Sequence, residues 1–213
     1  TKDVPKPMVE IGGKPAVQHH IELVKRHGIN DIVMLTSYLG EKIKDRFGVA
    51  YDGTRISYPH EPQQLGSGGA IKNAENALAD ADHFIVLNGD VMTNIDLKAL
   101  LDYHLRNAGI ATLVLRETDH PVDSDIVELD GNRVTRYIGR GQDEHRTANT
   151  GIMVLSRRIL GYIPKGFSNI EKDVIFGILG REKIFGFVSG AYIKDFGTFE
   201  RLESVRKQYG NQK

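Results

Sequence analysis

A chain of 213 residues, 40% of them hydrophobic and 26% charged, can form one α/β domain with a substantial core. Its 28 lysines and arginines balance its 28 aspartates and glutamates, so no net charge recruits nucleic acid or an anionic membrane. The absence of cysteine excludes disulfides, thiolate metal sites and cysteine nucleophiles, and no apolar run is long enough to span a membrane. We therefore expect a cytoplasmic protein without nucleic-acid or membrane partners. The sequence does not decide whether it forms a homo-oligomer.

The first half of the chain alternates predicted helices and strands. Pro15 suits the first position of a helix that ends near Gly28. Residues 83–90, HFIVLNGD, form a continuous apolar run, as in a central strand buried on both faces. Further strands are predicted at 31–38, 55–61 and 111–117, and helices at 40–48, 68–80 and 96–107. This alternation favours a Rossmann-like α/β fold with a mostly parallel sheet and helices on both faces.

After residue 124 the pattern changes. Residues 125–138 predict a β-hairpin with Asp130 and Gly131 at its turn. The remaining predicted elements are a buried strand at 150–156, a helix at 170–179, two short strands within 184–197 and an amphipathic helix at 198–210. The hairpin makes the sheet mixed. No repeat, low-complexity tract or long linker interrupts the chain, so residues 1–213 are predicted to form a single domain.

Two aspartates stand at the ends of apolar strands, where open α/β sheets bind their ligands. Asp90 could hold Mg²⁺ through hard oxygen ligation, or it could cap a loop or the next helix. Asp195, in IKDFGT, ends a second strand, although Thr198 is also a suitable N-cap for the last helix. Together the two carboxylates predict a site for a divalent cation that carries a nucleotide's phosphates. The eight histidines show no metal-ligand spacing and are expected to be structural.

Three further stretches carry features of ligand binding. The glycine-rich turn at 64–70, QLGSGGA, lets the backbone approach a ligand. It is neither a P-loop nor the G-x-G-x-x-G dinucleotide fingerprint, and a plain tight turn explains it equally well. Lys6 stands between two prolines, which fix the backbone on each side and aim its cation. In IEKDV, at 170–174, early acids suit a helix dipole, and Lys172 could bind a phosphate.

In chain order these motifs resemble the sugar-1-phosphate nucleotidyltransferase family. Its members read P-K-P-L-x-x-x-x-x-K-P, L-G-T-G-G-A, N-G-D, A-N-x-G-I, I-E-K-D-V and D-I-G-T-x-E along the chain. This sequence reads PKPMVEIGGKP, LGSGGA, NGD, ANTGI, IEKDV and DFGTFE, in that order. Each motif is weak alone, but the full set in register over essentially the whole chain is specific. The resemblance implies a nucleotidyltransferase fold like that of the glycosyltransferase-A group.

In that family a first β-strand and a glycine-rich loop ending in Gly-Thr-Arg precede the Pro-Lys-Pro stretch. The loop wraps the phosphates of the nucleotide. Here Pro5 stands almost at the start of the sequence. Either the strand and loop precede Thr1 in the natural protein, or the chain is truncated and inactive. We expect the former, because the strand would belong at the centre of the sheet.

The resemblance implies a role for each nucleotide-binding and metal-binding residue. Lys6 would contact the α-phosphate of the nucleotide. Asp90 would coordinate Mg²⁺ and help to hold the ribose or the phosphates, and Asp195 would be the second Mg²⁺ ligand. Three residues would lie against the base: Leu65, Gly66 and Gly69.

The resemblance also implies a sugar-phosphate site. Asn149 and Gly151 would line the sugar pocket, Glu171 would accept hydrogen bonds from sugar hydroxyls, and Lys172 would bind the sugar phosphate. Many members carry Glu-Lys-Pro after the hairpin, and its lysine helps to hold that phosphate. Here the region reads YIGRGQDEH, so Arg140 is the nearby cation that could substitute. Arginine is not a simple replacement for lysine, because it prefers bidentate contacts.

The implied reaction is in-line attack of a sugar phosphate oxygen on the α-phosphorus of an NTP, with pyrophosphate leaving. Catalysis would come mostly from positioning and charge neutralisation. The segments DHPVDSDIVELD and AYIKDFGTFERL resemble D-glycero-α-D-manno-heptose 1-phosphate guanylyltransferases, which favours GTP and that heptose 1-phosphate. The alternatives are an N-acetylmuramate or hexose 1-phosphate uridylyl- or guanylyltransferase, a noncatalytic domain that senses nucleotide sugars, and an NAD-binding domain built around GSGGA.

Overall fold

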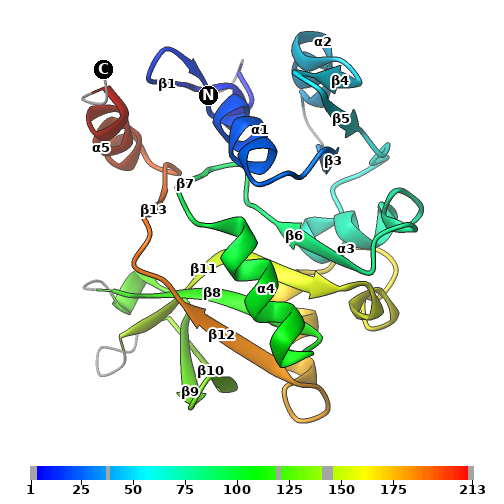
Figure 1. The fold of residues 1–213 in the computed structure, drawn as a ribbon, viewed down its shortest axis with the longest axis vertical. Helices are drawn as coiled ribbons and strands as arrows, with labels where there is room; N and C mark the ends of the chain where they lie inside the picture. Colours follow the sequence, from blue (N-terminus) through cyan, green and yellow to red (C-terminus); the bar gives the residue numbers. More distant parts are fainter. Residues whose placement is uncertain (1–3, 37–38, 119–120, 141–145, 211–213) are drawn as a thin grey trace. The chain divides into compact units, whose positions relative to one another are not determined.

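The computed structural model describes residues 4–36, 39–118, 121–140 and 146–210 (Figure 1). The chain divides into two compact units. Unit 1 comprises Thr1–Pro62, Asn88–Leu97 and Ala191–Lys213, and unit 2 comprises Gln63–Leu87 and Lys98–Gly190. Each unit has its own buried apolar clusters.

The helices of unit 1 include α1 (Ala16–Arg26), α2 (Gly40–Phe47) and α5 (Phe199–Gly210). α1 starts at Ala16, one residue after the predicted first position Pro15, and it ends before Gly28, as predicted; Gly28 has a φ of +76°. Small sheets accompany these helices: β1 (Glu10–Ile11) with β2 (Lys14–Pro15), β3 (Asp31–Val33) with β5 (Thr54–Ser57) and β4 (Ala50–Tyr51), and β7 (Val91–Thr93) with β13 (Ile193–Asp195). The predicted strand at 31–38 ends at Val33, and residues 37–38 lie outside the described ranges.

One apolar cluster of unit 1 fixes the strands that carry the two predicted metal ligands. Met92 of β7 is 1% exposed, and Phe196, which follows β13, is 4% exposed. They pack with Val205 of α5 and Ile11 of β1. Burial of such side chains stabilises the β7–β13 pair and so fixes the backbone on which Asp90 and Asp195 stand.

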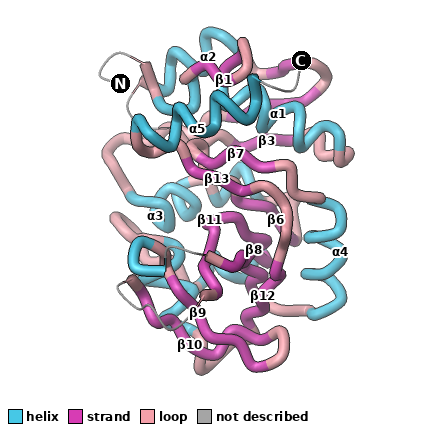
Figure 2. Tube along the Cα trace, turned by 90° about the vertical axis from the view of Figure 1, so that its left-hand side faces the viewer, coloured by secondary structure: helices cyan, strands magenta, loops and turns pink. Residues whose placement is uncertain are grey.

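Unit 2 is built on a six-stranded sheet in the order β6–β11–β8–β12–β10–β9 (Figure 2). Its strands are β6 (His83–Val86), β8 (Ala111–Glu117), β9 (Ile126–Asp130), β10 (Arg133–Gly139), β11 (Thr147–Ser156) and β12 (Ile184–Val188). β11 is antiparallel to β6, β8 and β9, and β10 is antiparallel to β12 and β9. β6, β8, β9 and β12 therefore point in one direction, and β10 and β11 in the other.

The mixed α/β class is confirmed, whereas the prediction of a mostly parallel sheet is wrong at the level of strand pairs. Among the described pairs only β8 with β12 and β3 with β5 are parallel. The reason is the interleaving of β10 and β11 between strands of the opposite direction. A strand–helix alternation predicts the direction of successive strands, but it does not predict which strand is inserted between them.

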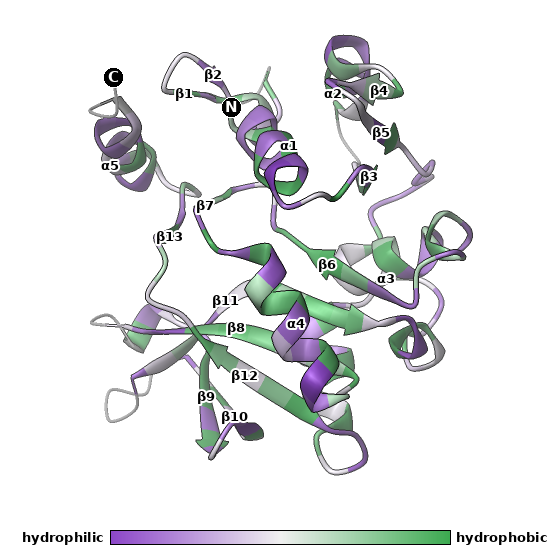
Figure 3. Cartoon of the chain, viewed as in Figure 1, coloured by the Kyte–Doolittle hydropathy of each residue, from purple (hydrophilic) through white to green (hydrophobic). Residues whose placement is uncertain are grey.

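The prediction that residues 83–90 form a central strand also differs from the structure. Among the described residues β6 pairs with β11 alone, and its four residues are all half-buried. Its apolar side chains still serve the core, because Phe84 and Val86 pack against the main cluster of unit 2. β6 and β8 are drawn largely in the hydrophobic colour in Figure 3. A continuous apolar run indicates that both faces of a strand are covered, but it does not indicate how many strands pair with it.

Helices cover both faces of this sheet, as predicted (Figures 1 and 2). On one face lies α4 (Leu97–Asn107), whose His104 shares a hydrogen bond of 2.9 Å with Thr112 of β8. On the other face lies α3 (Gly66–Asn73), whose Ile71 packs in the main cluster. Side chains along a strand alternate between the faces. The residues of β8 in the main cluster are accordingly Ala111, Leu113 and Leu115.

The predicted helix at 170–179 is two short turns of different type. Residues Ile170–Ile175 form one π-helical turn, called the π turn below, and Phe176–Ile178 form a 3₁₀ turn. π turns are rare and occur frequently at functional sites.

Among the described residues, no helix is both long enough and apolar enough to cross a membrane.

Candidate active site

The Pro-Lys-Pro and Asn-Gly-Asp motifs lie side by side in unit 1. A Cβ at Gly89 would lie 3.0 Å from Cγ of Pro7, so the absence of a side chain at Gly89 allows the two motifs to pack together. Lys6 begins a short 3₁₀ turn, Lys6–Met8. Its Nζ lies 3.6 Å from Oδ2 of Asp90. The stiff segment therefore holds a cation beside the first predicted metal ligand.

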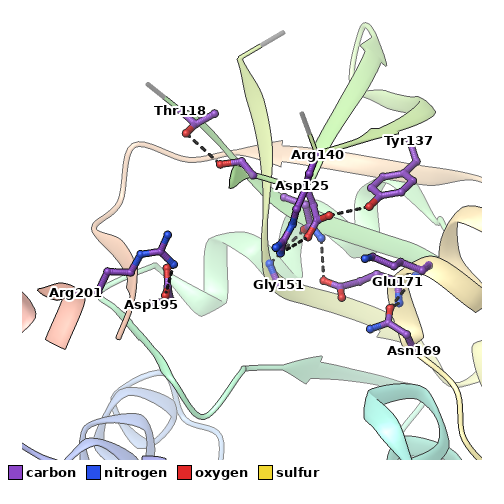
Figure 4. A network of polar contacts seen from close by, with 12 residues as sticks. Thr118, Asp125, Tyr137, Arg140, Gly151, Asn169, Glu171, Asp195 and Arg201 are labelled. Carbon is purple, nitrogen blue, oxygen red and sulfur yellow. Dashed lines mark hydrogen bonds and ion pairs between the residues drawn. The ribbon is translucent and has the colours of Figure 1, made fainter. Parts of the chain in front are cut away.

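Asp195 is the last residue of β13, the strand paired with β7. The backbone N–H of Phe196 donates a hydrogen bond of 2.9 Å to the carbonyl oxygen of Asp90, which brings the two predicted metal ligands to the same end of the β7–β13 pair. Nη1 of Arg201 in α5 lies 2.8 Å from Oδ1 of Asp195 (Figure 4). Lys6 is thus paired with Asp90, and Arg201 with Asp195, so each carboxylate has its own cationic partner at this end of the β7–β13 pair.

The carboxylates of Asp90 and Asp195 are donors of the kind that Mg²⁺ binds. The side chains of Asp90 and Asp195 are 35% and 40% exposed, so water and a phosphate can complete a coordination shell around them. Mg²⁺ is commonly held by one or two carboxylates together with substrate phosphates. Among the described residues no group of three or more acidic, histidine or cysteine side chains could hold a metal by itself. This pair suits a cation that arrives with a phosphorylated ligand.

The glycine-rich turn, residues 64–70, belongs to unit 2, and from Gly66 onward it forms the first part of α3. Its glycines allow the 165–169 loop to approach closely. A Cβ at Gly66 would lie 2.5 Å from the carbonyl oxygen of Ser168, and a Cβ at Gly69 would overlap the carbonyl oxygen of Gly166. Gly66 also has a φ of +70°, which glycine adopts without strain. Packing within the chain therefore explains these glycines, and contact of Leu65, Gly66 and Gly69 with a base stays a prediction.

Three of the predicted sugar-site residues are joined by hydrogen bonds in unit 2. Nδ2 of Asn149 donates to Oε1 of Glu171 at 2.9 Å, and the N–H of Gly151 donates to Oδ1 of Asn149 at 3.3 Å. Gly151 has a φ of +78° at an irregularity in the β11–β8 register, where a glycine is required. Figure 4 shows Glu171 and Gly151 in this network. Burial raises the pKa of Glu171 above its ordinary value, although the Asn149 hydrogen bond acts in the opposite direction.

Arg140 is joined to the same site by a residue that the sequence analysis missed. Nη2 of Arg140 lies 3.1 Å from Oδ2 of Asp125, and the hydroxyl of Tyr137 donates to Oδ1 of Asp125 at 2.7 Å (Figure 4). The Tyr137 ring stacks on Phe176, with ring centroids 4.1 Å apart. Residues 141–145 of the predicted lysine-motif region lie outside the described ranges.

Asp125 has opposing influences on its ionisation. Burial by itself would raise its pKa, but the hydrogen bonds from Tyr137 and Arg140 lower the pKa below its ordinary value. Asp125 is therefore a carboxylate near neutral pH. Burial and the Asp125 hydrogen bond raise the pKa of Tyr137 to about 12, so its hydroxyl keeps its proton. Arg140 is consequently a paired cation, and a phosphate would have to share it with Asp125.

Lys172 is exposed and stands at the start of the π turn. Its charge lowers the pKa values of both Asp125 and Glu171, so its ammonium lies in the same electrostatic environment as these carboxylates. The carboxamide of Asn169 caps the turn by accepting the backbone N–H groups of Glu171 and Lys172 at 3.0 and 2.8 Å. Unit 2 thus combines hydrogen-bonding carboxylates with two cations, a set suited to a hydroxyl-rich phosphate ester.

Comparison with known proteins agrees with the motifs. Residues 1–212 match the family described as Nucleotidyl transferase. The mannose-1-phosphate guanylyltransferase of Mycobacterium tuberculosis is 33% identical over 206 residues, which cover 94% of this chain and 57% of the relative. The D-glycero-alpha-D-manno-heptose 1-phosphate guanylyltransferase of Aneurinibacillus thermoaerophilus is 27% identical over 208 residues, which cover 97% of this chain and 90% of the relative. The chain spans a little over half the length of the mannose-1-phosphate relatives.

A solved structure has the same fold. The crystal structure of HddC from Yersinia pseudotuberculosis, complexed with GMP-PN, is similar with a TM-score of 0.83 at 27% identity, over 97% of this chain and 90% of that one. The family inferred from the motifs is confirmed, because the family match over residues 1–212 includes all of these motifs. The chain belongs to the nucleotidyl transferase family.

Proposed function

We propose that the protein transfers a nucleotidyl group from an NTP to a sugar 1-phosphate, giving a nucleotide sugar and pyrophosphate. The observation that carries the proposal is the ion pair of Lys6 with Asp90, together with the backbone hydrogen bond that brings Asp90 and Asp195 to one end of the β7–β13 pair in unit 1. A cation and two accessible carboxylates at one strand end suit the polyphosphate of a nucleotide and its metal. The family match supports the same chemistry.

In the proposed reaction an oxygen of the sugar phosphate attacks the α-phosphorus of the NTP. The bond between the α-phosphorus and the bridging oxygen breaks, and pyrophosphate leaves with that oxygen. Lys6 would contact the α-phosphate and stabilise the charge that develops there. The protein would contribute positioning and charge neutralisation rather than a covalent intermediate. A divalent cation held by Asp90 and Asp195 would neutralise phosphate charge.

The residues of unit 2 would hold the sugar 1-phosphate. Glu171, oriented by Asn149, would accept hydrogen bonds from sugar hydroxyls. Lys172 would contact the phosphate, and Arg140 would take the place of the usual lysine while Asp125 orients it. Asp125 would also offer an acceptor to the sugar.

The proposed donor is GTP, and the proposed acceptor is D-glycero-α-D-manno-heptose 1-phosphate. Relatives named as guanylyltransferases for mannose 1-phosphate and for this heptose 1-phosphate both support GTP. The two sugars share the manno configuration and differ by one carbon. Mannose 1-phosphate is the second candidate: the mannose enzyme has the higher identity, 33% against 27%, but the match covers 57% of its length against 90% of the heptose enzyme.

The first experiment is pyrophosphate release by the full-length protein with Mg²⁺. Each NTP would be paired with the 1-phosphates of this heptose, mannose, glucose and N-acetylmuramate. We expect turnover with GTP and a manno-configured sugar. Turnover with UTP and N-acetylmuramate 1-phosphate would replace the proposed substrates, and silence of folded protein across the panel would contradict catalysis and favour a noncatalytic sensor.

The carboxylate pair gives a sharper test. We expect Asp90→Asn and Asp195→Asn each to lower kcat by at least about 10²-fold, because each change removes a charge that balances the metal and phosphates. Asp45→Asn, an exposed position in α2 of the same unit, is the matched control and should keep wild-type turnover. Wild-type rates in both site variants would overturn the metal assignment.

A further inference from the structure

Backbone hydrogen bonds within unit 2 join the glycine-rich turn to the 165–169 loop, which leads into the π turn. The N–H groups of Gly68 and Gly69 donate to the carbonyl oxygen of Ser168 at 2.8 and 3.3 Å, and the N–H of Ser168 donates to the carbonyl oxygen of Leu65 at 2.9 Å. Ser168 is 1% exposed and comes just before the π turn. The 165–169 loop is therefore held firmly against the glycine-rich turn.

One side chain continues this connection into the π turn itself. The hydroxyl oxygen of Ser67 accepts the backbone N–H of Ile170, the first residue of the π turn, at 3.0 Å. The next two N–H groups, those of Glu171 and Lys172, are accepted by Asn169. The first N–H groups of a helical turn have no partner inside it. Here side chains satisfy three in succession, and Ser67 supplies the acceptor from a distant part of the sequence.

Ile170 is well placed to transmit this contact. Its side chain is 2% exposed and packs in the main apolar cluster, so the residue is fixed by the core and by Ser67. Glu171 follows directly and is held from β11 by Asn149. The position of the Glu171 carboxylate and of Lys172 thus depends on how the turn starts.

We infer that Ser67 is a positioning residue that fixes the start of the π turn, and through it Glu171 and Lys172, against the glycine-rich turn. This inference rests on the proposed function, because it assigns the sugar phosphate to the π turn. Ser67 itself need not touch either substrate. Its hydroxyl would set the geometry in which the sugar phosphate is held while the nucleotide is bound.

The position of Ser67 allows a clean test. Its side chain is exposed, so removing the hydroxyl leaves no cavity in the core. We expect Ser67→Ala to raise KM for the sugar 1-phosphate about five- to tenfold, since one hydrogen bond to a backbone N–H is lost. KM for GTP should change by less than about twofold, and Ser67→Thr, which keeps the hydroxyl, should restore the wild-type value.

The matched control is Ser156→Ala. Ser156 stands at the opposite end of β11 from Asn149, and its hydroxyl also accepts a backbone N–H, that of Arg158, at 3.4 Å. The change removes the same kind of contact from the same unit, and it should leave both KM values unchanged. An equal rise of the sugar-phosphate KM in Ser156→Ala would mean that the effect is general loosening and would overturn the inference.

A second background tests whether Ser67 acts through the π turn. If it does, Ser67→Ala should have little further effect on KM in a protein that carries both Glu171→Gln and Lys172→Met, because both contacts that it positions are already lost. Full additivity of Ser67→Ala with this background would place the action of Ser67 elsewhere and overturn the inference.

Hydrogen exchange separates failure of this inference from failure of the proposed function. Without any substrate, the amides of 170–175 should exchange faster in Ser67→Ala than in the wild-type protein, while those of β8 stay protected. Wild-type turnover with unchanged KM in Ser67→Ala would overturn the inference alone. If the wild-type protein has no turnover, unchanged exchange at 170–175 would overturn it, and faster exchange would support the structural part.

Discussion

Glu171 is a site carboxylate whose pKa is raised above the ordinary value of a glutamate. It is half-buried, its carboxylate accepts a hydrogen bond from Asn149, and its pKa is raised mainly by burial. A carboxylate that accepts sugar hydroxyls must be ionised to offer all of its lone pairs. The raised pKa therefore moves the pH at which this site gains its acceptor strength upward from the ordinary range of a glutamate.

This balance predicts an acid limb in the pH profile of the reaction. The group is protonated below its raised pKa, so kcat/KM for the sugar phosphate should fall as the pH drops through that value. Glu171→Gln should lower kcat/KM by about 10- to 100-fold at pH 8 and remove this limb. The check is the profile of both proteins between pH 4.5 and 8. An unchanged limb in the variant would show that another group titrates.

At the residue scale the sequence predicted which types of residue gather but not all of their partners. Lys6 is paired with Asp90, and Asn149 is hydrogen-bonded to Glu171, whereas the ligand roles that the motifs imply for these residues stay predictions. Asp125 and Tyr137 were missed because the hairpin was read only as a structural element. Their contact depends on the irregular register of β9 and β10, which the alternation of residues does not specify.

At the scale of the elements, the sequence of the glycine-rich turn is constrained by its packing against the 165–169 loop. Its glycines face the 165–169 loop so closely that side chains are excluded, and the N–H groups of Gly68 and Gly69 bond to that loop. A motif that resembles a ligand-binding turn is thus also the contact surface for another segment of unit 2. Substitutions there should act first on stability and only then on binding.

Gly69→Ala tests this view of the element. Alanine is normally favoured over glycine inside a helix, but here its Cβ would overlap the carbonyl oxygen of Gly166. We expect the free energy of unfolding to fall by about 1–3 kcal/mol, as for other overpacked sites. Gly177→Ala is the control, because a Cβ there would meet no atom within 4 Å. Urea denaturation of both variants decides the matter, and equal stability would contradict the packing account.

The predictability of elements followed the strength of their local signals. The strand at 111–117 and the helix at 40–48 were predicted nearly residue by residue, because the strand contains a continuous apolar run and the helix has Ile43 and Phe47 one turn apart between two glycines. The π turn at Ile170–Ile175 could not be predicted, since its sequence has an ordinary helical pattern. Tertiary contacts accompany this turn: Asn149 of β11 is hydrogen-bonded to Glu171, and Ser67 of α3 is hydrogen-bonded to Ile170.

The stability of the molecule should depend on a buried histidine in unit 2, which is hydrogen-bonded to a second, half-buried histidine. His104 of α4 is 0% exposed and lies 3.0 Å from Nδ1 of His83, with Thr112 on its other ring nitrogen. Burial, together with the neighbouring His83, lowers the pKa of His104 from 6.5 to about 4. In the unfolded chain the ring takes up a proton near pH 6.5, so the unfolded state binds more protons between these values.

The resulting pH dependence has a definite sign. Stability from the neutral His104 is fully present above pH 6.5 and is lost as the pH falls toward 4, by up to about 3 kcal/mol. His104→Gln should flatten this part of the curve of unfolding free energy against pH. The exposed His60→Gln is the control and should keep the wild-type slope. A wild-type slope in His104→Gln would assign the effect to other groups.

At the scale of the molecule the class of fold was predictable, but the strand order was not. The sequence distinguishes a regular strand–helix region from a later hairpin region, and this distinction predicted a mixed sheet with helices on both faces. The insertion of β11 between β6 and β8 joins residues that are far apart in the chain. Such pairing is decided by the total burial of several faces at once, and no local pattern reports it.

The division of unit 1 into three separated segments has a consequence for biosynthesis. A ribosome makes Gly190, the last residue of unit 2, before it makes the final segment of unit 1. Until Ile193–Asp195 has emerged, β7 lacks its partner strand, and Met92 lacks the cover of Phe196 and Val205. Domains generally fold as their residues become available during translation. Unit 1, whose first segment precedes unit 2 in the chain, is therefore completed after unit 2. A nascent chain stalled before Ile193 would carry Asp90 but would lack the β13 strand and Asp195.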